Sequence, residues 1–361
     1  MTTILTTKNI QEIIQIIGFE NFILGLIRYL ETDYVNWHEF EKTPRIAFYK
    51  NKGVMELMPI CGPDLFAFKY VNGHPDNVKL NKPTVIGLGM LTSTSTGEPL
   101  MISEMTLLTA LRTAATSSMA SKFLANKIIS NFGIIGCGSQ SEFQTLAHFA
   151  NFKFKQVFYY DLDKSAMHKF KRNLNNQGFD LIPCSTAQEV VLKSQIVTTA
   201  TACTESQEVI KADWLQPGQH LNCIGGDSPN KTELDLNILY KVKTVVEYLP
   251  QTLHEGEIQN LGHGAEEYVS AELWEVIKKT KKVRTSIQDI TLFDSVGFAL
   301  EDYSVLRYLY DLANKLKIFN SMEITPQLKD CKDLYSSLTP ITHAYLGFPD
   351  NSHYKNAKIF E

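Results

Sequence analysis

The stretch FGIIGCGSQS, residues 132–141, places a short apolar run directly before two closely spaced glycines. This pattern predicts a strand, a tight turn at Gly136 and Gly138, and a helix that begins near Ser141. A glycine at position 138 lets a pyrophosphate approach the backbone, and the unpaired N–H groups of a helix N-terminus bind such an anion. Ser141 stands where the common dinucleotide fingerprint has its third glycine, but the strand, turn and helix still predict a dinucleotide site.

An acidic residue strengthens this interpretation. Asp161 ends the next apolar run, 157–160, and follows Gly136 by 25 residues. A carboxylate in that place binds the ribose hydroxyls of NAD and repels the 2′-phosphate of NADP. We therefore expect NAD as the cofactor, although Lys164 lies close by in the sequence.

The chain after residue 126 alternates short apolar runs with helical segments. Strands are expected at 157–160, 179–183, 195–200, 220–224 and 243–247, with helices at 141–149, 164–175, 186–193 and 298–316. This alternation predicts a parallel sheet covered on both faces, which is an α/β fold of the Rossmann type.

The first 125 residues differ, since they mix helices at 10–30 and 103–125 with short alternating strands and a hairpin around 95–99. We expect an NAD-binding domain at 126–317. The tail is too small for a domain of its own, so residues 318–361 should return to 1–125 as one discontinuous α+β domain.

Composition narrows the class of protein. A length of 361 residues favours two domains, and a net charge of −4 gives no reason to expect nucleic acid or an anionic membrane as partner. The six cysteines form no CxxC pair and no zinc spacing, so we expect reduced thiols, no metal site and a cytoplasmic protein. Charged residues interrupt the apolar stretch 10–30, which therefore reads as an amphipathic helix rather than a membrane span.

Three basic residues, Arg45, Lys69 and Arg112, stand among apolar or small neighbours. A cation on a buried face needs a partner, and the carboxylate of a small substrate would provide one. Alternatively, each cation pairs with a nearby acid or extends its charged end to water.

Two acids are candidates for chemistry. Glu56 shares one face of the strand 54–58 with Met58, where it is either exposed to solvent or buried to meet an ammonium. Asp227 follows two glycines after the strand 220–224, at the sheet edge where ligands bind in α/β folds. Lys231 is its nearest cation in the sequence, so we expect the charge of Asp227 to be available for acid–base work. The alternative is a turn residue.

Taken together, these segments resemble the ornithine cyclodeaminase/mu-crystallin family. The stretches that carry the resemblance are 53–59 (GVMELMP), 103–117 (SEMTLLTALRTAATS), 136–144 (GCGSQSEFQ), 225–234 (GGDSPNKTEL) and 291–307 (TLFDSVGFALEDYSVLR).

The resemblance implies a Rossmann domain and a second domain that binds substrate and forms a homodimer. It further implies that the three cations bind the carboxylate of an amino acid, that Asp227 is catalytic, and that Glu56 meets the side-chain ammonium in the ornithine-converting branch. The remaining expected site residues are Met58 beside the substrate and Gly136, Gly138, Ser139, Gln140, Asp161 and Thr113 beside the cofactor.

The reaction implied by the resemblance converts L-ornithine to L-proline and ammonia with recycled NAD and no net oxidation. Alternatives within the family are a lysine cyclodeaminase, a net ketimine reductase or an alanine dehydrogenase. A third possibility is a crystallin-like protein that binds NAD without catalysis. Asp161 disfavours an NADPH-dependent reductase, and Glu56 disfavours a small apolar substrate.

Overall fold

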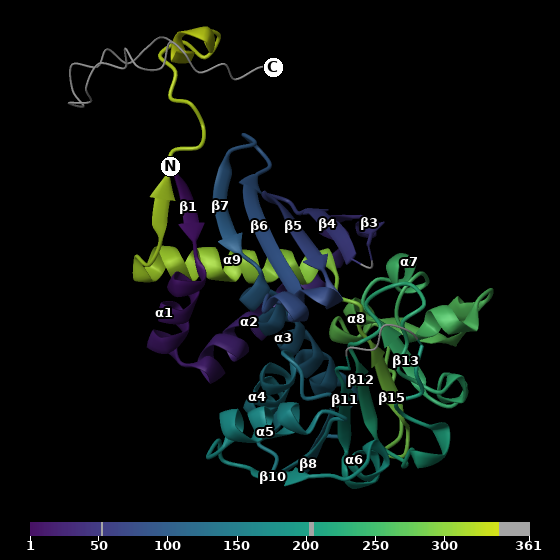
Figure 1. Cartoon of the computed structure of the whole chain (residues 1–361). Helices are drawn as coiled ribbons and strands as arrows, with labels where there is room; N and C mark the ends of the chain where they lie inside the picture. Colours follow the sequence, from purple (N-terminus) through teal and green to yellow (C-terminus); the bar gives the residue numbers. More distant parts are fainter. Residues whose placement is uncertain (52, 202–205, 339–361) are drawn as a thin grey trace.

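Two eight-stranded sheets form the framework of the chain (Figure 1). This computed structural model describes residues 1–51, 53–201 and 206–338. One sheet is built from the N-terminal part of the chain and a late strand, and the other from the middle part. The last expected segment, 339–361, and Cys203 lie outside the described residues.

The second sheet is entirely parallel and has the strand order β10-β9-β8-β11-β12-β15-β13-β14. Its strands are β8 (Asn131–Ile135), β9 (Gln156–Tyr160), β10 (Asp180–Pro183), β11 (Ile196–Thr199), β12 (His220–Cys223), β13 (Lys243–Val246), β14 (Val269–Glu272) and β15 (Thr291–Asp294). The chain reverses its direction of travel across the sheet between β8 and β11, which creates the crevice where ligands bind in this class of fold. The predicted Rossmann-type sheet is confirmed, and β14 and β15 are strands that the sequence did not predict.

The helices that connect these strands agree with the expected ones within a few residues. The expected helices are α4 (Ser141–Phe152), α5 (Lys164–Leu174) and α6 (Ala187–Lys193), whereas the shorter α7 (Leu249–Thr252) and α8 (Leu273–Ile277) were not predicted. α5 begins where the side chain of Asp163 accepts a hydrogen bond from the backbone of Ser165, and α6 begins at an equivalent cap on Thr186.

The first sheet is mainly antiparallel. Its strands are β1 (Thr2–Leu5), β2 (Glu41–Lys42), β3 (Ile46–Lys50), β4 (Gly53–Cys61), β5 (Leu65–Gly73), β6 (Val85–Ser93), β7 (Pro99–Glu104) and β16 (Asn320–Met322). The predicted hairpin joins β6 to β7, with Gly97 at a φ of 74° in its turn. β16 pairs with β1, so residues 320–322 lie in the first sheet, while the return of the tail to a discontinuous domain remains a prediction.

Alternation along the strands gives this sheet two different faces. Met58 and Lys69 are paired across β4 and β5 and are buried, as is Glu56 on the same face. The intervening row Leu57, Tyr70 and Leu88 is exposed on the opposite face. The period of two therefore turns the candidate site residues inward and leaves an apolar row outside.

Four helices pack beside the first sheet: α1 (Thr7–Ile17), α2 (Phe19–Val35), α3 (Thr106–Leu124) and α9 (Ala299–Leu316). α3 packs on α2 and α9 and also on α4 and β15, so it joins the two sheets. α9 crosses the strands of the first sheet and packs on β4, β5 and β6 (Figure 1). The predicted boundaries assign this helix to the NAD-binding domain, residues 126–317. Its packing favours a boundary before residue 299, and the division into two domains remains a proposal.

The prediction of one continuous helix at 10–30 is wrong. Gly18 adopts a φ of 80° and divides the segment into α1 and α2, which are bent by 103°. Both halves keep an apolar face, which is why the periodicity alone did not show the break. Among the described residues no single helix has the length and apolar character to cross a membrane, although the bent pair together meets those two criteria.

Candidate active site

Lys69 and Arg112 meet at one carboxylate of α9. Nζ of Lys69 lies 2.9 Å from Oδ1 of Asp302, and Nε of Arg112 lies 3.1 Å from the same oxygen. Nη1 of Arg112 also lies 2.6 Å from Oε2 of Glu301. All four side chains are buried. Strand β5 and helix α3 thus bring together two of the three predicted cations, while their binding of a substrate carboxylate stays a prediction.

The ammonium of Lys69 is poised to titrate near neutral pH. Burial, assisted by the positive charge of Arg112, lowers the pKa of Lys69 to about 8, while Asp302 opposes the shift. The side chain is only 1% exposed. Lys69 is therefore mainly charged at pH 7 and loses its charge in the mildly alkaline range.

The third cation, Arg45, precedes β3 and links the two sheets. Its Nη1 lies 3.2 Å from Oε1 of Glu56, and its Nη2 donates to the carbonyl oxygens of Val296 and Gly297. Its Nε lies 3.2 Å from Oε2 of Glu255. Arg45 thus points inward as predicted, but protein groups surround its guanidinium on every side in this structure.

Glu56 is buried on β4, so the alternative of a solvent-facing side chain is wrong. Both of its carboxylate oxygens accept from Nη1 of Arg45, at 3.2 and 3.3 Å. The expected contact with a substrate ammonium would therefore add to an existing ion pair. Met58, two residues along the same face, lies opposite Lys69 in the register of β4 and β5.

Glu255 is a site residue that the sequence reasoning missed. It follows α7, its side chain is 6% exposed, and it contacts Nε of Arg45, whereas Glu56 contacts Nη1. Burial raises the pKa of Glu255 to about 7, opposed by Arg45 and reinforced by the negative charges of Glu56 and Asp227. A buried carboxyl with this pKa exchanges a proton readily at neutral pH.

Glu301 and Asp302 were also missed as individual residues. They lie in the first turn of α9, more than 180 residues after Arg112 in the chain. Burial raises the pKa of Glu301 well above its usual range, helped by the buried Glu247 to which it is hydrogen-bonded. We infer that Glu247 and Glu301 share one proton. The signal in the sequence was the pair of acids inside the otherwise apolar run GFALEDYSVL.

Asp227 lies on the loop after β12, and its environment differs from the expected one. Its Oδ1 forms an ion pair with Nζ of Lys231 at 2.8 Å, and its side chain is 52% exposed. The expectation that Lys231 would leave the charge of Asp227 free is therefore wrong, because the residues four apart curl back within one loop. The backbone oxygen of Asp227 nevertheless lies 3.5 Å from Nη1 of Arg45, which places this loop beside the cations.

Three buried carboxylates hold the loop of Asp227 in place. Glu233 accepts from the backbone of Gly225, and Glu257 accepts from the backbone of Glu233. Asp294, at the end of β15, accepts in turn from the backbone of Glu257. Asp294 at the end of the parallel sheet thus fixes the segment of Glu257, and Glu257 fixes the segment of Glu233. Glu233 in turn fixes the start of the Asp227 loop at Gly225.

The predicted cofactor turn follows β8. Gly136 has a φ of 97°, and a side chain there would collide with the backbone of Ala200 after β11. A side chain at Gly138 would meet nothing within 4 Å, so the backbone is open to an incoming group. Oδ2 of Asp161 accepts from the backbone N–H of Cys137 at 2.6 Å, and Oδ1 accepts from Asp163 at 2.8 Å. The acid predicted to bind ribose is therefore fixed at the turn.

Other predicted cofactor residues occupy nearby positions. Ser139 is exposed beside Gly138, and Gln140 precedes α4 without capping it through its side chain. Oε1 of Gln140 is buried and has no hydrogen-bond partner in the described part of the chain. Thr113 follows Arg112 on α3, which packs against α4. The turn has the open backbone and uncapped helix start that a dinucleotide pyrophosphate requires.

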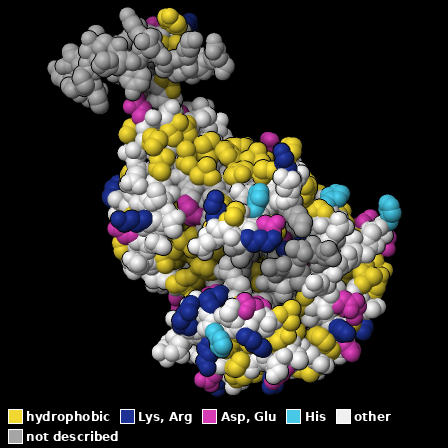
Figure 2. All heavy atoms as spheres, viewed as in Figure 1, with side chains coloured by type: hydrophobic (Ala, Val, Ile, Leu, Met, Phe, Trp, Pro, Cys, Tyr) yellow, Lys and Arg dark blue, Asp and Glu magenta, His cyan; other side chains and the backbone are white. Residues whose placement is uncertain are grey.

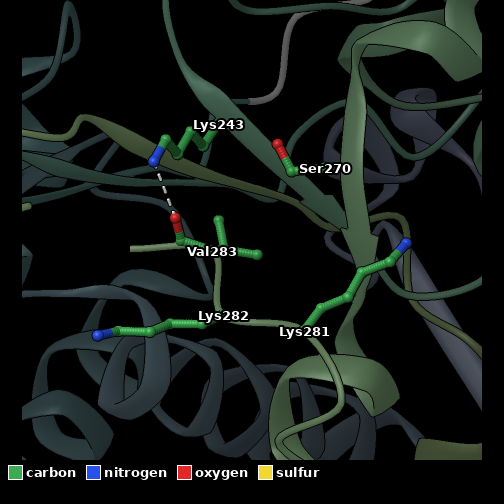
Figure 3. Close-up of a pocket in the computed structure, with 5 residues that line it drawn as sticks. All are labelled: Lys243, Ser270, Lys281, Lys282 and Val283. Atoms are coloured by element: carbon green, nitrogen blue, oxygen red, sulfur yellow. Dashed lines mark hydrogen bonds between the residues drawn. The ribbon is translucent and has the colours of Figure 1, made fainter. Parts of the chain in front are cut away.

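Two shallow surface pockets lie apart from this cluster. One of about 370 Å³ is lined by Lys243, Ser270, Lys281, Lys282 and Val283 (Figure 3). Lys243 bonds to the backbone of Val283 there, and Lys281 and Lys282 point away from each other. The other, of about 400 Å³, is lined by residues of α5 and by β9 and β10 with the residues that follow. Neither pocket includes the buried cations, so the geometry of the charged cluster identifies the candidate site.

Comparison with known proteins agrees with this geometry. A model of the ornithine cyclodeaminase/mu-crystallin family matches residues 7–317. An ornithine cyclodeaminase of Agrobacterium fabrum is 42% identical over 334 residues, which cover 92% of this chain and 94% of that protein.

Solved structures match over a similar length. An archaeal alanine dehydrogenase dimer with bound NAD has a TM-score of 0.83 at 33% identity, covering 90% of this chain and 99% of that one. A lysine cyclodeaminase, solved to explain recognition of L-lysine, L-ornithine and L-2,4-diaminobutyric acid, has a TM-score of 0.87 at 25% identity, covering 92% and 98%. The family model covers the whole second sheet, strands β2 to β7 of the first sheet and every residue of the charged cluster. This chain therefore belongs to the ornithine cyclodeaminase/mu-crystallin family.

Proposed function

We propose that this protein is an ornithine cyclodeaminase that converts L-ornithine to L-proline and ammonia with NAD as a recycled cofactor. One observation carries the proposal: a buried cluster of cations able to bind an α-carboxylate lies beside two buried carboxylates, Glu56 and Glu255, able to bind a second ammonium. The 42% identity to a named ornithine cyclodeaminase supports the same substrate.

The charges of the cluster favour a cationic substrate. The three cations of the cluster carry three positive charges. The carboxylates that face them are Glu56, Glu255 and Asp302, with one negative charge each when ionised, and the Glu247–Glu301 pair, which carries one negative charge because we infer that it shares one proton. One negative charge is therefore in excess when Glu255 is ionised. Ornithine carries one net positive charge at neutral pH, whereas alanine carries none, so ornithine complements the cluster and alanine does not.

NAD fits the turn after β8. Gly136 permits the tight turn and Gly138 leaves the backbone open, Ser139 and Gln140 lead into α4, and Asp161 supplies a carboxylate for the ribose. When bound, NAD supplies an acceptor and later a donor of hydride at the substrate Cα. An archaeal alanine dehydrogenase of this fold binds NAD.

The protein's own residues position the substrate and move protons. Lys69 and Arg112 bind the α-carboxylate, with Asp302 holding both cations until the substrate arrives. Glu56 binds the distal ammonium while its carboxylate stays paired with Arg45. A carboxylate must then remove one proton from this ammonium, because only the neutral amine attacks Cα to close the ring. Asp227 lies on a loop that reaches Arg45 and handles a proton as the α-amino group leaves as ammonia.

The open face of the first sheet favours a homodimer. Ile46, Leu57, Tyr70 and Leu88 form one continuous row across four strands, and each is between 38% and 47% exposed. Figure 2 shows hydrophobic side chains gathered over the strands of this sheet. A flat apolar row of this kind is typical of a surface that pairs with a second copy.

The proposed reaction is tested by incubating the pure protein with NAD⁺ and ornithine, lysine or alanine in parallel. We expect proline and ammonia in equal amounts from ornithine and no accumulation of NADH. Pipecolate formed faster than proline would identify a lysine cyclodeaminase instead, and NADH formed from alanine would identify a dehydrogenase.

A further inference from the structure

Three carboxylates surround the place where the distal ammonium is proposed to bind, but they differ in their partners. Both carboxylate oxygens of Glu56 accept hydrogen bonds from Arg45. Asp227 is paired with Lys231 and half exposed. Oε2 of Glu255 is buried and, although it lies 3.2 Å from Nε of Arg45, it accepts no hydrogen bond from any described residue. A buried carboxylate oxygen without a donor is unfavourable, and a substrate ammonium would satisfy it.

The backbone around Glu255 holds it in this position. The next residue, Gly256, has a φ of 74°, and its N–H donates to the carbonyl of Gly226 at 2.7 Å. A side chain at Gly256 would collide with the carboxylate of Asp294. The backbone that carries Glu255 is therefore tied to Gly226, one residue before Asp227, and to the end of β15.

We propose that Glu255 binds the distal ammonium of the substrate and accepts the proton that this ammonium must lose before ring closure. In this step an N–H bond of the ammonium breaks, an O–H bond forms on Glu255, and the neutral amine keeps its electron pair for attack on Cα. The assignment rests on the proposed cyclodeaminase function and deepens it, since it names the base.

The electrostatics of the site agree with this role. The charged and titratable groups that face Glu255 are Arg45, Glu56, Asp227 and Tyr49. Burial raises the pKa of Glu255 to about 7, so at neutral pH a large share of the molecules present a carboxylate ready to take a proton. The single cation at its side, Arg45, is shared with Glu56.

Two probes that are not turned over separate the contacts of Glu255 from those of the cations. The first probe, 5-aminopentanoate, carries the distal ammonium and the carboxylate of ornithine but lacks the α-amino group. The second, pentanoate, carries the carboxylate alone. Binding of each to the NAD-loaded protein is measured by calorimetry between pH 5.5 and 8.

For the wild-type protein we expect the affinity for 5-aminopentanoate to rise about tenfold per pH unit below pH 7 and then level off, as Glu255 ionises. Pentanoate should show no such rise. Glu255→Gln should bind 5-aminopentanoate about tenfold or more weakly at pH 7.5, without the rise, and should bind pentanoate within about twofold of wild type. Its rate of proline formation should fall by about 10²–10⁴-fold, the usual effect of losing a general base.

Glu266→Gln, which changes an exposed glutamate, is the matched control and should leave both affinities unchanged. Glu255→Asp keeps the carboxylate and should retain a preference for 5-aminopentanoate, so it tests the assignment if Glu255→Gln folds poorly. A folded Glu255→Gln protein with the wild-type ratio of the two affinities would overturn the assignment. A wild-type protein that binds the probes as expected but forms no proline would overturn the proposed function and leave the ammonium contact intact.

Discussion

Replacement of Lys69 by Met tests whether the buried cations bind a carboxylate. Lys69 is 1% exposed, and the salt bridge of its ammonium within the described residues goes to one carboxylate oxygen of Asp302. A hydrogen bond to a charged group contributes about 1.5–3 kcal/mol. Since about 1.4 kcal/mol corresponds to a factor of ten, Lys69→Met should weaken pentanoate binding at pH 7 by about 10- to 150-fold.

The pH dependence gives a sharper test. Burial lowers the pKa of Lys69 to about 8, and only its charged form attracts the carboxylate. Binding is therefore strongest below pH 8 and is lost as the pH rises through this value. For the wild-type protein the affinity for pentanoate should fall about tenfold between pH 7 and pH 9, whereas the Lys69→Met protein should bind weakly with no such fall.

Calorimetry with pentanoate measures both effects, because this ligand does not ionise between pH 7 and pH 9. Lys79→Met, which removes a lysine whose side chain is 78% exposed, is the matched control and should behave as wild type. NAD affinity and the thermal unfolding temperature, measured in parallel, show whether each variant is folded. A wild-type affinity that stays constant up to pH 9, or a Lys69→Met protein that keeps the wild-type pH dependence, would refute the reasoning.

Three further predictions concern other residues of the site. Arg112→Ala should raise the KM for ornithine about tenfold or more, because a charge-assisted contact is lost. An unchanged KM in a folded variant would assign Arg112 to structure alone. Asp161 should make the protein bind NAD more tightly than NADP in fluorescence titrations, and comparable dissociation constants for the two cofactors would exclude this. Asp227→Asn should still bind NAD and ornithine but form proline about 10²–10⁴-fold more slowly. Near-normal proline formation would reduce Asp227 to a loop residue.

The sequence was most informative where local periodicity and burial coincide. Strands β8, β9, β11, β12 and β13 are short segments that the parallel sheet buries almost completely, and they and the edge strand β10 were predicted within one or two residues. β14 (VSAE) and β15 (TLFD) were not predicted, although β10 to β13 are equally short, because the regular alternation of strands with longer helices stops after β13. The break of the helix at Gly18 was not predicted, because a single glycine can also occur inside a continuous helix.

In the candidate site, too, the residues with a local sequence signal were predicted and their distant partners were not. Arg45, Lys69 and Arg112 were identified because a cation among apolar residues requires a partner, and the structure finds all three buried. The partners themselves were not identified, because Glu255 and Asp302 come from segments about 190 or more residues away in the chain. No local pattern records which acid the fold brings to which cation.

The most direct test of the central claim uses ornithine that carries deuterium at Cα, incubated with the pure protein and NAD⁺. Cyclodeamination with an internally recycled hydride predicts proline that keeps the deuterium at Cα, one ammonia for each proline, and no net NADH. The products are measured by mass spectrometry, and NADH by its absorbance. Accumulation of NADH in proportion to the ornithine consumed, or proline that has lost the deuterium, would contradict the account.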